Sequence, residues 1–142
     1  MMSKVVWKGG MAFTGKSDSG YLIPLDAKKR AGGQEMGFQP LQLFAIGLVG
    51  CTAMDVISIL KKKRQEVTDF EVSAQIERAE DHPRVFTKII VEYKLTGKDL
   101  DRSAVERAVE LSETRYCPAQ AMLEKAAEIS HKIIIQQADE AD

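Results

Sequence analysis

The longest apolar run of the chain predicts one long helix near its middle. Pro40 suits the first turn of a helix, and we expect this helix to reach about Arg64, after the basic cluster that begins at Lys61. Apolar residues fall on nearly every face of it, so it should be buried on all sides. A domain of this size cannot enclose such a helix alone, which predicts a homodimer in which a second copy covers part of it. Gly47 and Gly50 would let the other backbone approach closely.

Short apolar segments before this helix predict strands. They are residues 5–7, 11–13 and 21–25, each bounded by glycine-containing or serine-rich turn sequences. Such an alternation of short strands and turns is typical of a β-meander. The following segment, residues 26–37, contains little that could be buried, and we expect an irregular connection there.

Two further strands are predicted after the long helix. Residues 70–76 alternate between apolar and polar side chains, the period-two pattern of a strand with one exposed face. Residues 85–95 form a second run rich in β-branched residues, whose apolar face consists of Ile89, Val91, Tyr93 and Leu95. The turn sequence Asp81-His82-Pro83 between them predicts a hairpin, and Gly97 is expected to end the second strand.

The last third of the chain predicts two helices and a final strand. Ser103 and Glu106 have the spacing of a capping box, ahead of a helix that we expect to end near Tyr116. The predicted apolar face of this helix consists of Val105, Ala108, Val109 and Ser112. Pro118 suits the first turn of a short helix that reaches Ala127, and the β-branched run 129–136 predicts a strand. This segregation of strands and helices is typical of an α+β fold, and we expect a single domain over residues 1–142.

Composition and charge exclude several classes of protein. The chain has 142 residues, 44% of them hydrophobic and 29% charged, which is enough to bury one core. A net charge of −1 and an isoelectric point near 6.2 provide no electrostatic footprint for nucleic acid or for an acidic membrane surface, so neither is expected as a partner. The uncharged apolar stretch 43–54 is too short for a bilayer span, and residues 1–12 lack the apolar core of a signal peptide. We therefore expect a cytoplasmic protein in a reducing compartment.

Two cysteines carry the candidate chemistry. Cys51 lies inside the apolar run, and Cys117 precedes Pro118 at the predicted break between two helices. In a reducing compartment such residues are more often free thiols or a transient catalytic pair than a structural disulfide, and free cysteines also occur as inert packing. As the cap of the helix from Pro118, Cys117 is expected to gain some thiolate stabilisation from the helix dipole. The residues alone do not decide which cysteine would attack first.

No metal or cofactor is expected. His82 and His131, together with the two cysteines, lack the ligand spacing of a zinc site. We expect His82 in a turn and His131 at a half-exposed position of the last strand. The chain has no glycine-rich phosphate loop and no serine-triad signature.

Two groups of motifs carry a resemblance to a known family. They are Pro40-Leu41-Gln42-Leu43-Phe44 leading into Gly50-Cys51-Thr52-Ala53-Met54-Asp55, and Leu111-Ser112 leading into Tyr116-Cys117-Pro118. They resemble the OsmC/Ohr family of osmotically inducible and organic hydroperoxide resistance proteins, in its OsmC-like branch. The resemblance implies an OsmC-like fold, an intertwined homodimer whose long central helices pack against antiparallel sheets. It also implies that Cys51 is the peroxidatic thiol and that Cys117 resolves its sulfenic acid into a disulfide, which a small or protein dithiol reductant then reduces.

The residues that would activate the thiol depart from the family pattern. Cys51 lies eleven residues after Pro40, beyond the reach of the helix dipole, so a side chain must stabilise its thiolate. Family members use an arginine held by a glutamate. Lys16 stands at the arginine position, and the glutamate position is that of Leu41 in Ohr proteins and that of Gln42 in many OsmC-like relatives. Lysine supplies charge without the bidentate fork of arginine, and glutamine forms hydrogen bonds but no ion pair. Asp55 shares a helix face with Cys51, where a carboxylate disfavours a thiolate unless it faces a donor or a partner helix.

Together these features predict a thiol-dependent peroxidase that reduces organic hydroperoxides in oxidative-stress defence, with H₂O₂ as a second candidate substrate. The competing hypothesis is a non-catalytic OsmC-like dimer that binds a small molecule or senses redox state. The rate at which peroxide oxidises Cys51 distinguishes the two. The sequence does not name the peroxide or the reductant.

Overall fold

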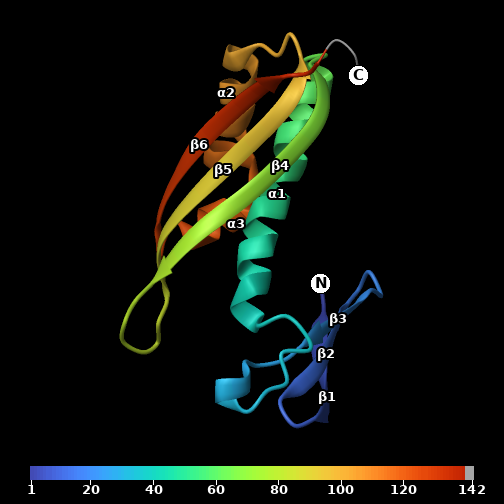
Figure 1. Cartoon of the computed structure of the whole chain (residues 1–142), viewed down its shortest axis with the longest axis vertical. Helices are drawn as coiled ribbons and strands as arrows, with labels where there is room; N and C mark the ends of the chain where they lie inside the picture. The colour runs from blue at the N-terminus through green and yellow to red at the C-terminus, as the bar shows by residue number, and fades with distance from the viewer. Residues whose placement is uncertain (140–142) are drawn as a thin grey trace. The chain divides into compact units, whose positions relative to one another are not determined.

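The computed structural model describes residues 1–139. The chain divides into two compact units, Met1–Ile46 and Gly47–Asp142, and each has its own three-stranded sheet. Figure 1 labels the helices and strands. Helices and sheets are segregated along the chain, which confirms the predicted α+β class, whereas the single domain over residues 1–142 stays a prediction.

The first unit contains the predicted β-meander. Strands β1 (Ser3–Gly9), β2 (Ala12–Ser17) and β3 (Leu22–Leu25) pair antiparallel in that order. After them comes the predicted irregular connection, which contains the short 3₁₀ helix η1 (Lys29–Ala31). The buried carboxylate of Asp26 ties this connection together, accepting the backbone N–H groups of Ala27 (2.7 Å), Gln34 and Met36 (both 3.3 Å). These bonds, that of Ala27 foremost, hold the pKa of Asp26 below its ordinary value.

Helix α1 (Pro40–Lys62) confirms the predicted long helix and ends two residues before the expected boundary. At its start, the side-chain oxygen of Gln42 accepts the backbone N–H of Gln39 at 2.9 Å, which is one half of a capping box. At its end, Arg64 has a φ of +58°, in the left-handed region that stops a helix. By length and composition alone α1 could cross a membrane, a test that the core helix of a soluble protein also passes.

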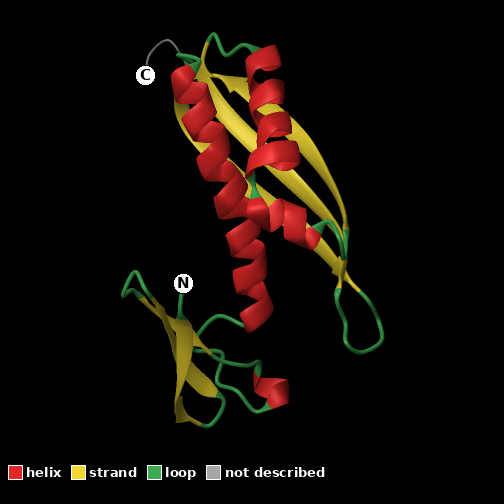
Figure 2. Cartoon of the chain, turned by 180° about the vertical axis from the view of Figure 1, so that it is seen from behind, coloured by secondary structure: helices red, strands yellow, loops and turns green. Residues whose placement is uncertain are grey.

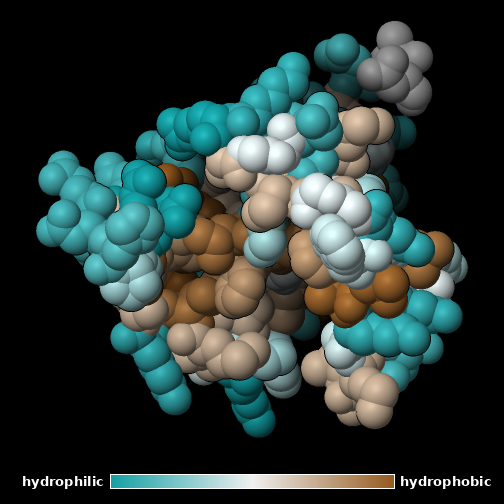
Figure 3. All heavy atoms as spheres, turned by 90° about the horizontal axis from the view of Figure 1, so that it is seen from below, coloured by the Kyte–Doolittle hydropathy of each residue, from teal (hydrophilic) through white to brown (hydrophobic). Residues whose placement is uncertain are grey.

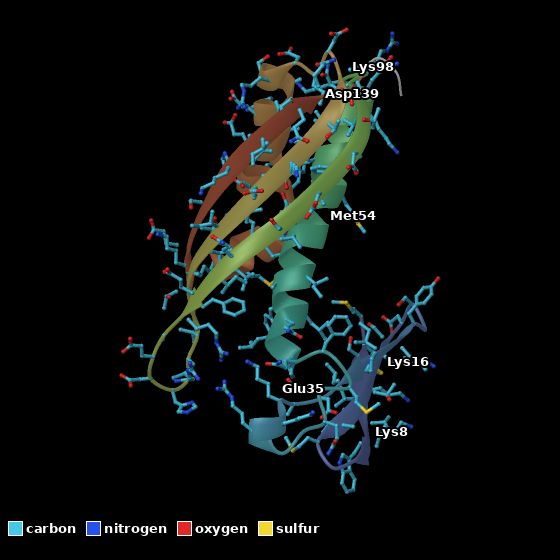
Figure 4. All side chains as sticks on the ribbon, in the orientation of Figure 1. Lys8, Lys16, Glu35, Met54, Lys98 and Asp139 are labelled. Carbon is cyan, nitrogen blue, oxygen red and sulfur yellow. The ribbon has the colours of Figure 1, made fainter. Side chains whose placement is uncertain are left out.

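One stripe of α1 is buried, so the expected burial on all sides is not reached within a single chain. The buried residues are spaced by four and are Leu48, Thr52, Val56 and Leu60. By contrast, Phe44, Ile46 and Met54 are 57%, 49% and 74% exposed. Met54 projects from the helix into open space (Figure 4), and Figure 3 shows apolar side chains, in brown, at the surface among hydrophilic ones. The second copy that would cover them stays a prediction.

The second unit contains a sheet with β5 at its centre. Strands β4 (Glu66–Arg78) and β5 (Phe86–Lys98) form the predicted antiparallel hairpin. Strand β6 (Glu128–Gln137) pairs parallel with β5, so the sheet is mixed and the expectation of purely antiparallel sheets is wrong at this pair. The chain reaches β6 through α2 (Arg102–Leu111), the π-helical turn η2 (Ser112–Tyr116) and α3 (Pro118–Leu123). Such a helical crossover returns the chain to the end where β5 begins, which makes the next strand parallel.

Helices α1 and α2 cover one face of this sheet (Figure 2). The predicted inner face of β5 is at most 1% exposed and consists of Ile89, Val91, Tyr93 and Leu95. The buried residues of α1 and of α2, among them Val105 and Val109, complete this core. Because burying each such side chain contributes about 1.5–3 kcal/mol, the core positions the central part of α1 more firmly than helix propensity does.

The strand end predicted at Gly97 is wrong, because β5 continues to Lys98. A Cβ at Gly97 would collide with the carbonyl oxygen of Glu66 and would lie 2.9 Å from Cγ of Leu100. The glycine therefore permits a close approach inside the sheet and does not end the strand.

The capping box predicted from Ser103 and Glu106 is also wrong. Asp101 is the N-cap of α2, and its carboxylate accepts the hydroxyl (2.8 Å) and the backbone N–H (3.0 Å) of Ser103. Glu106 pairs with Arg102 at 3.3 Å instead. The hydroxyl of Ser103 is the main cause that holds the pKa of Asp101 below its ordinary value. A carboxylate at the N-cap also interacts with the helix dipole, which favours the earlier start.

Candidate functional site

The two cysteines lie together in the second unit. Cys51 is in the middle of α1, and Cys117 lies between η2 and α3. Both Sγ atoms and one carboxylate oxygen of Asp55 lie within 4.8 Å of one another. Both thiols are free, Cys51 partly exposed and Cys117 buried. The fold therefore brings together two cysteines that are far apart in the sequence, as a paired chemistry requires.

Cys117 is the N-cap of α3, as predicted, and its Sγ accepts the backbone N–H of Gln120 at 3.3 Å. The expected thiolate stabilisation is outweighed, because burial raises the pKa of the Cys117 thiol to about 11. The neighbouring Cys51 thiol raises this pKa further, whereas the N–H of Gln120 lowers it. Helix α3 ends at Leu123, four residues before the predicted boundary, and so has little dipole to set against burial. Cys117 therefore keeps its proton at neutral pH.

Asp55 meets a donor, one of the two arrangements expected to relieve its effect on the thiol. Its Oδ2 atom lies 3.0 Å from Oγ of Ser112, the first residue of the π-helical turn η2. The side chains of Cys51 and Asp55 share a face of α1, as their spacing by four residues predicts.

A chain of buried hydroxyl groups extends from this contact into the core. Ser112 Oγ lies 2.8 Å from Thr52 Oγ1, which lies 2.7 Å from the hydroxyl of Tyr93. The three residues are 0%, 1% and 0% exposed. Burial raises the pKa of Tyr93 above its ordinary value, and the hydrogen bond with Thr52 opposes this. These hydroxyl contacts were not predicted from the sequence, although a threonine in the apolar run and a serine on a predicted apolar helix face were a visible signal.

The hydroxyl chain ends at a carboxyl group and a histidine near the edge of the sheet. The Tyr93 hydroxyl lies 3.0 Å from Oε1 of Glu113, and Oε2 of Glu113 lies 2.9 Å from Nδ1 of His131. The His131 ring also packs edge-on against Tyr93, with ring centroids 6.2 Å apart. The side chain of His131 is 40% exposed, which confirms its predicted half-exposed position on the last strand.

A cavity of about 410 Å³ opens beside Asp55. Its lining combines apolar and polar side chains from α1, α2 and η2, namely Asp55, Ser58, Ile59, Lys62, Leu111 and Tyr116. Asp55 connects the cavity to the thiol pair, because it lines the cavity and its carboxylate lies within 4.8 Å of both Sγ atoms. The volume of the cavity falls in the range typical of small-molecule sites.

Lys16 and Gln42, the candidate activating residues, belong to the first unit. Lys16 is exposed on β2 (Figure 4), opposite Lys4 of β1. It lines a hollow of about 280 Å³ that Leu43 also lines. Gln42 uses its side-chain oxygen to cap α1.

The thiol cluster does not form a closed metal site. Among the residues that the structure describes, it offers three ligand atoms, whereas a structural zinc site needs four. His131 is bonded to Glu113, and His82 lies in the turn between β4 and β5, where it was predicted. The absence of a metal and of a cofactor stays a prediction.

Comparisons with known proteins agree with this architecture. A family model described as OsmC-like protein matches residues 32–132. Protein YhfA of Escherichia coli K12 is 42% identical over 131 residues, which cover 92% of this chain and 95% of YhfA. A hypothetical protein from Aquifex aeolicus VF5 superposes with a TM-score of 0.85 at 27% identity, over 97% of each chain. The organic hydroperoxide resistance protein OhrB of Bacillus subtilis superposes with a TM-score of 0.62 at 26% identity, over 94% of this chain and 98% of OhrB. The chain belongs to the OsmC-like protein family, whose fold it shares.

Proposed function

We propose that the protein is a thiol-dependent peroxidase that reduces organic hydroperoxides through Cys51 and Cys117. The observation that carries this proposal is the approach of the two Sγ atoms to within 4.8 Å in the core of an OsmC-like fold. Two free thiols at this separation need only a small movement to reach the S–S bond length of about 2.05 Å. Cys117 lies at the junction of η2 and α3, where such a movement disturbs little regular structure.

The difference in burial supports an assignment of roles. Cys51, partly exposed, is the thiol that meets the peroxide, whereas the buried Cys117 is 3% exposed and holds its proton. The Cys51 thiolate attacks the distal peroxide oxygen, the O–O bond breaks, and the alkoxide takes a proton and leaves as an alcohol. The Cys117 sulfur then displaces water from the Cys51 sulfenic acid to form the disulfide. A small or protein dithiol reductant returns both thiols and is itself oxidised to a disulfide.

The cavity beside Asp55 supports an organic peroxide as the substrate. Ile59, Leu111 and the ring of Tyr116 provide apolar surface for an alkyl or aryl group. H₂O₂ has no such group to place there. An alkyl hydroperoxide should therefore react faster than H₂O₂.

Lys16 and Gln42 are our candidates for the activating pair. A lysine ammonium stabilises a thiolate as a point charge, which is weaker than the fork of an arginine. Replacing Lys16 by arginine together with Gln42 by glutamate should therefore raise the rate of Cys51 oxidation. Lys4→Arg, on the neighbouring strand, is the matched control, and an unchanged rate in the double variant would count against this pair.

We also propose a homodimer in a reducing compartment such as the cytoplasm. The exposed apolar residues of α1 support it, since Phe44, Ile46 and Met54 lie outside the buried stripe. A Cβ added at Gly47 or Gly50 would meet nothing within 4 Å in the single chain, which leaves room there for a second helix.

A second candidate function is a non-catalytic dimer that binds a small molecule or senses redox state. The observation in its favour is the hydrogen bond from the Gln39 backbone to Gln42, which occupies the side chain that would orient Lys16. In that case Cys51 would react with peroxide no faster than a free thiol.

A stopped-flow titration of the reduced protein with cumene hydroperoxide and with H₂O₂ tests the proposal. We expect Cys51 to be oxidised at least about a hundredfold faster than a small free thiol, within the range of acid–base assistance. Mass spectrometry should find an intramolecular disulfide in the native protein and none in Cys51→Ser or Cys117→Ser. A rate equal to that of a free thiol would transfer the proposal to the sensing or binding dimer.

A further inference from the structure

The hydroxyl chain contains one hydrogen bond more than its hydroxyl protons can make. Four contacts of 2.7–3.0 Å connect Asp55, the hydroxyls of Ser112, Thr52 and Tyr93, and Glu113. Each contact needs a proton between its two oxygens, since lone pairs that face each other at this distance in a dry interior repel. Three hydroxyl groups supply three protons.

The shortage is clearest when both carboxyl groups are ionised. Ser112 then donates to Asp55, and Tyr93 donates to Glu113. The proton of Thr52 alone remains for two contacts, 2.8 Å to Ser112 and 2.7 Å to Tyr93. One of these two contacts would then have no proton. Because Ser112, Thr52 and Tyr93 are at most 1% exposed, water cannot supply the missing proton.

A fourth proton on either carboxyl group satisfies every contact. If Asp55 holds it, each group donates toward Glu113 in turn; if Glu113 holds it, each group donates toward Asp55. The two arrangements differ by one proton moved along the chain and by the direction of all four bonds. No heavy atom has to move.

We propose that Asp55 and Glu113 share this proton through the three hydroxyls, and that the chain is a two-way proton relay between the thiol pair and His131. At the inner end, Asp55 faces the thiols of Cys51 and Cys117. At the outer end, Glu113 faces Tyr93 and the half-exposed ring of His131, through which protons exchange with solvent. Lys62, which lines the same cavity as Asp55, is a further charged group at this inner end of the hydroxyl chain.

The use of this relay in catalysis rests on the proposed peroxidase function. When the shared proton is on Glu113, Asp55 is ionised and accepts the proton of the Cys51 thiol, which leaves a thiolate beside a neutral carboxyl group and removes the repulsion expected from the sequence. When the thiolate takes the distal oxygen and the O–O bond breaks, Asp55 returns that proton to the departing alkoxide. In the second step it carries the Cys117 proton to the departing hydroxide. Both steps are balanced without an added cofactor, and Thr52, Ser112 and Tyr93 act as positioning residues.

The shared proton is measurable without any substrate. In reduced protein labelled with ¹³C at aspartate and glutamate carboxyl carbons, the Asp55 and Glu113 signals at pH 7 should together report one bound proton. Asp55→Asn and Glu113→Gln assign the two signals. Thr52→Val removes the central hydroxyl, leaving two hydroxyls for two contacts, so the bound proton should disappear. Thr52→Ser keeps the hydroxyl and should keep the proton.

If Thr52→Val does not fold, Tyr93→Phe replaces it in the test. This variant also leaves two hydroxyls for two contacts, so the proton bound by the two carboxyl groups should disappear. Two ionised carboxyl groups in the folded native protein would overturn the proposal, as would a bound proton that persists in Thr52→Val. In stopped flow, Thr52→Val should oxidise at least about tenfold more slowly than Thr52→Ser. A bound proton without peroxide reactivity would uphold the shared proton and refute the peroxidase, whereas fast peroxide reactivity without the proton would refute the relay alone.

Discussion

Replacing Cys117 by alanine should change how the stability of the protein depends on pH. Burial raises the pKa of this thiol from its ordinary value of 9.0 to about 11 in the folded chain. Below pH 9 the thiol is protonated in the folded and the unfolded chain alike, so it contributes no slope. Between pH 9 and 11 the unfolded chain releases the proton while the folded chain keeps it, so the free energy of unfolding falls as pH rises. Two pKa units at about 1.4 kcal/mol each amount to about 3 kcal/mol.

The assay is urea denaturation of native protein and Cys117→Ala in parallel at pH 8, 9, 10 and 11, under a reductant that holds both thiols reduced. The lost sulfur also costs stability, but that cost does not depend on pH and cancels in the slope. The raised pKa of Tyr93 affects both proteins, and most of its contribution cancels, because Cys117 is only the last and smallest of the causes that raise it. The stability difference between them should shrink by about 3 kcal/mol over this range. A constant difference would refute the conclusion that Cys117 is held as a neutral thiol, and repeating the pair in a Cys51→Ser background isolates the share due to burial.

Three other substitutions, with Glu106→Ala as a control, test the fold and the assembly. In urea denaturation, Gly97→Ala should destabilise the protein by more than about 2 kcal/mol, because its Cβ would collide with the Glu66 carbonyl. A loss below about 0.5 kcal/mol would contradict that close approach. Asp101→Ala should lower the Tm by a few degrees at neutral pH, and by less as the pH falls through the lowered pKa of this carboxyl group. Glu106→Ala, the control, should have little effect on the Tm. A larger loss in Glu106→Ala than in Asp101→Ala would restore the predicted capping box. Gly50→Leu, whose Cβ would meet nothing within 4 Å in the single chain, should weaken the proposed homodimer in sedimentation velocity, and an unchanged dimer would place the interface elsewhere.

Asp55 lies where helix geometry predicts it, but this position alone does not decide its effect on the Cys51 thiol. Its position four residues after Cys51 places a carboxyl group beside the thiol, as expected from helix geometry. Whether that group opposes a thiolate depends also on its hydrogen bond with Ser112, which lies 57 residues away at the start of the π-helical turn. A π-helical turn at this point is itself typical of functional sites.

The sequence alone determined the secondary structure elements and their order, because each depends on a local repeat. A period of two predicted the hairpin and the inner face of β5, and the apolar run after Pro40 predicted α1 within two residues of its end. It also supplied the family, through motifs around Cys51 and Cys117. The predictions from local pattern were wrong at Gly97 and at the start of α2. Whether a strand continues and which residue caps a helix depend on neighbours in space, which the local pattern does not contain.

Only the tertiary structure decided the state of the site. Thr52 meets Tyr93 across 41 residues of sequence and Ser112 across 60, and Ser112 meets Asp55 across 57. No repeat of two or four residues records such contacts, because they arise where α1, β5 and η2 pack around one core. The same packing buries Cys117 and reverses the effect expected from its helix cap. The local pattern of the sequence thus shows which thiol, hydroxyl and carboxyl groups are present. The protons that these groups hold depend on the distances between them, which only the folded molecule sets.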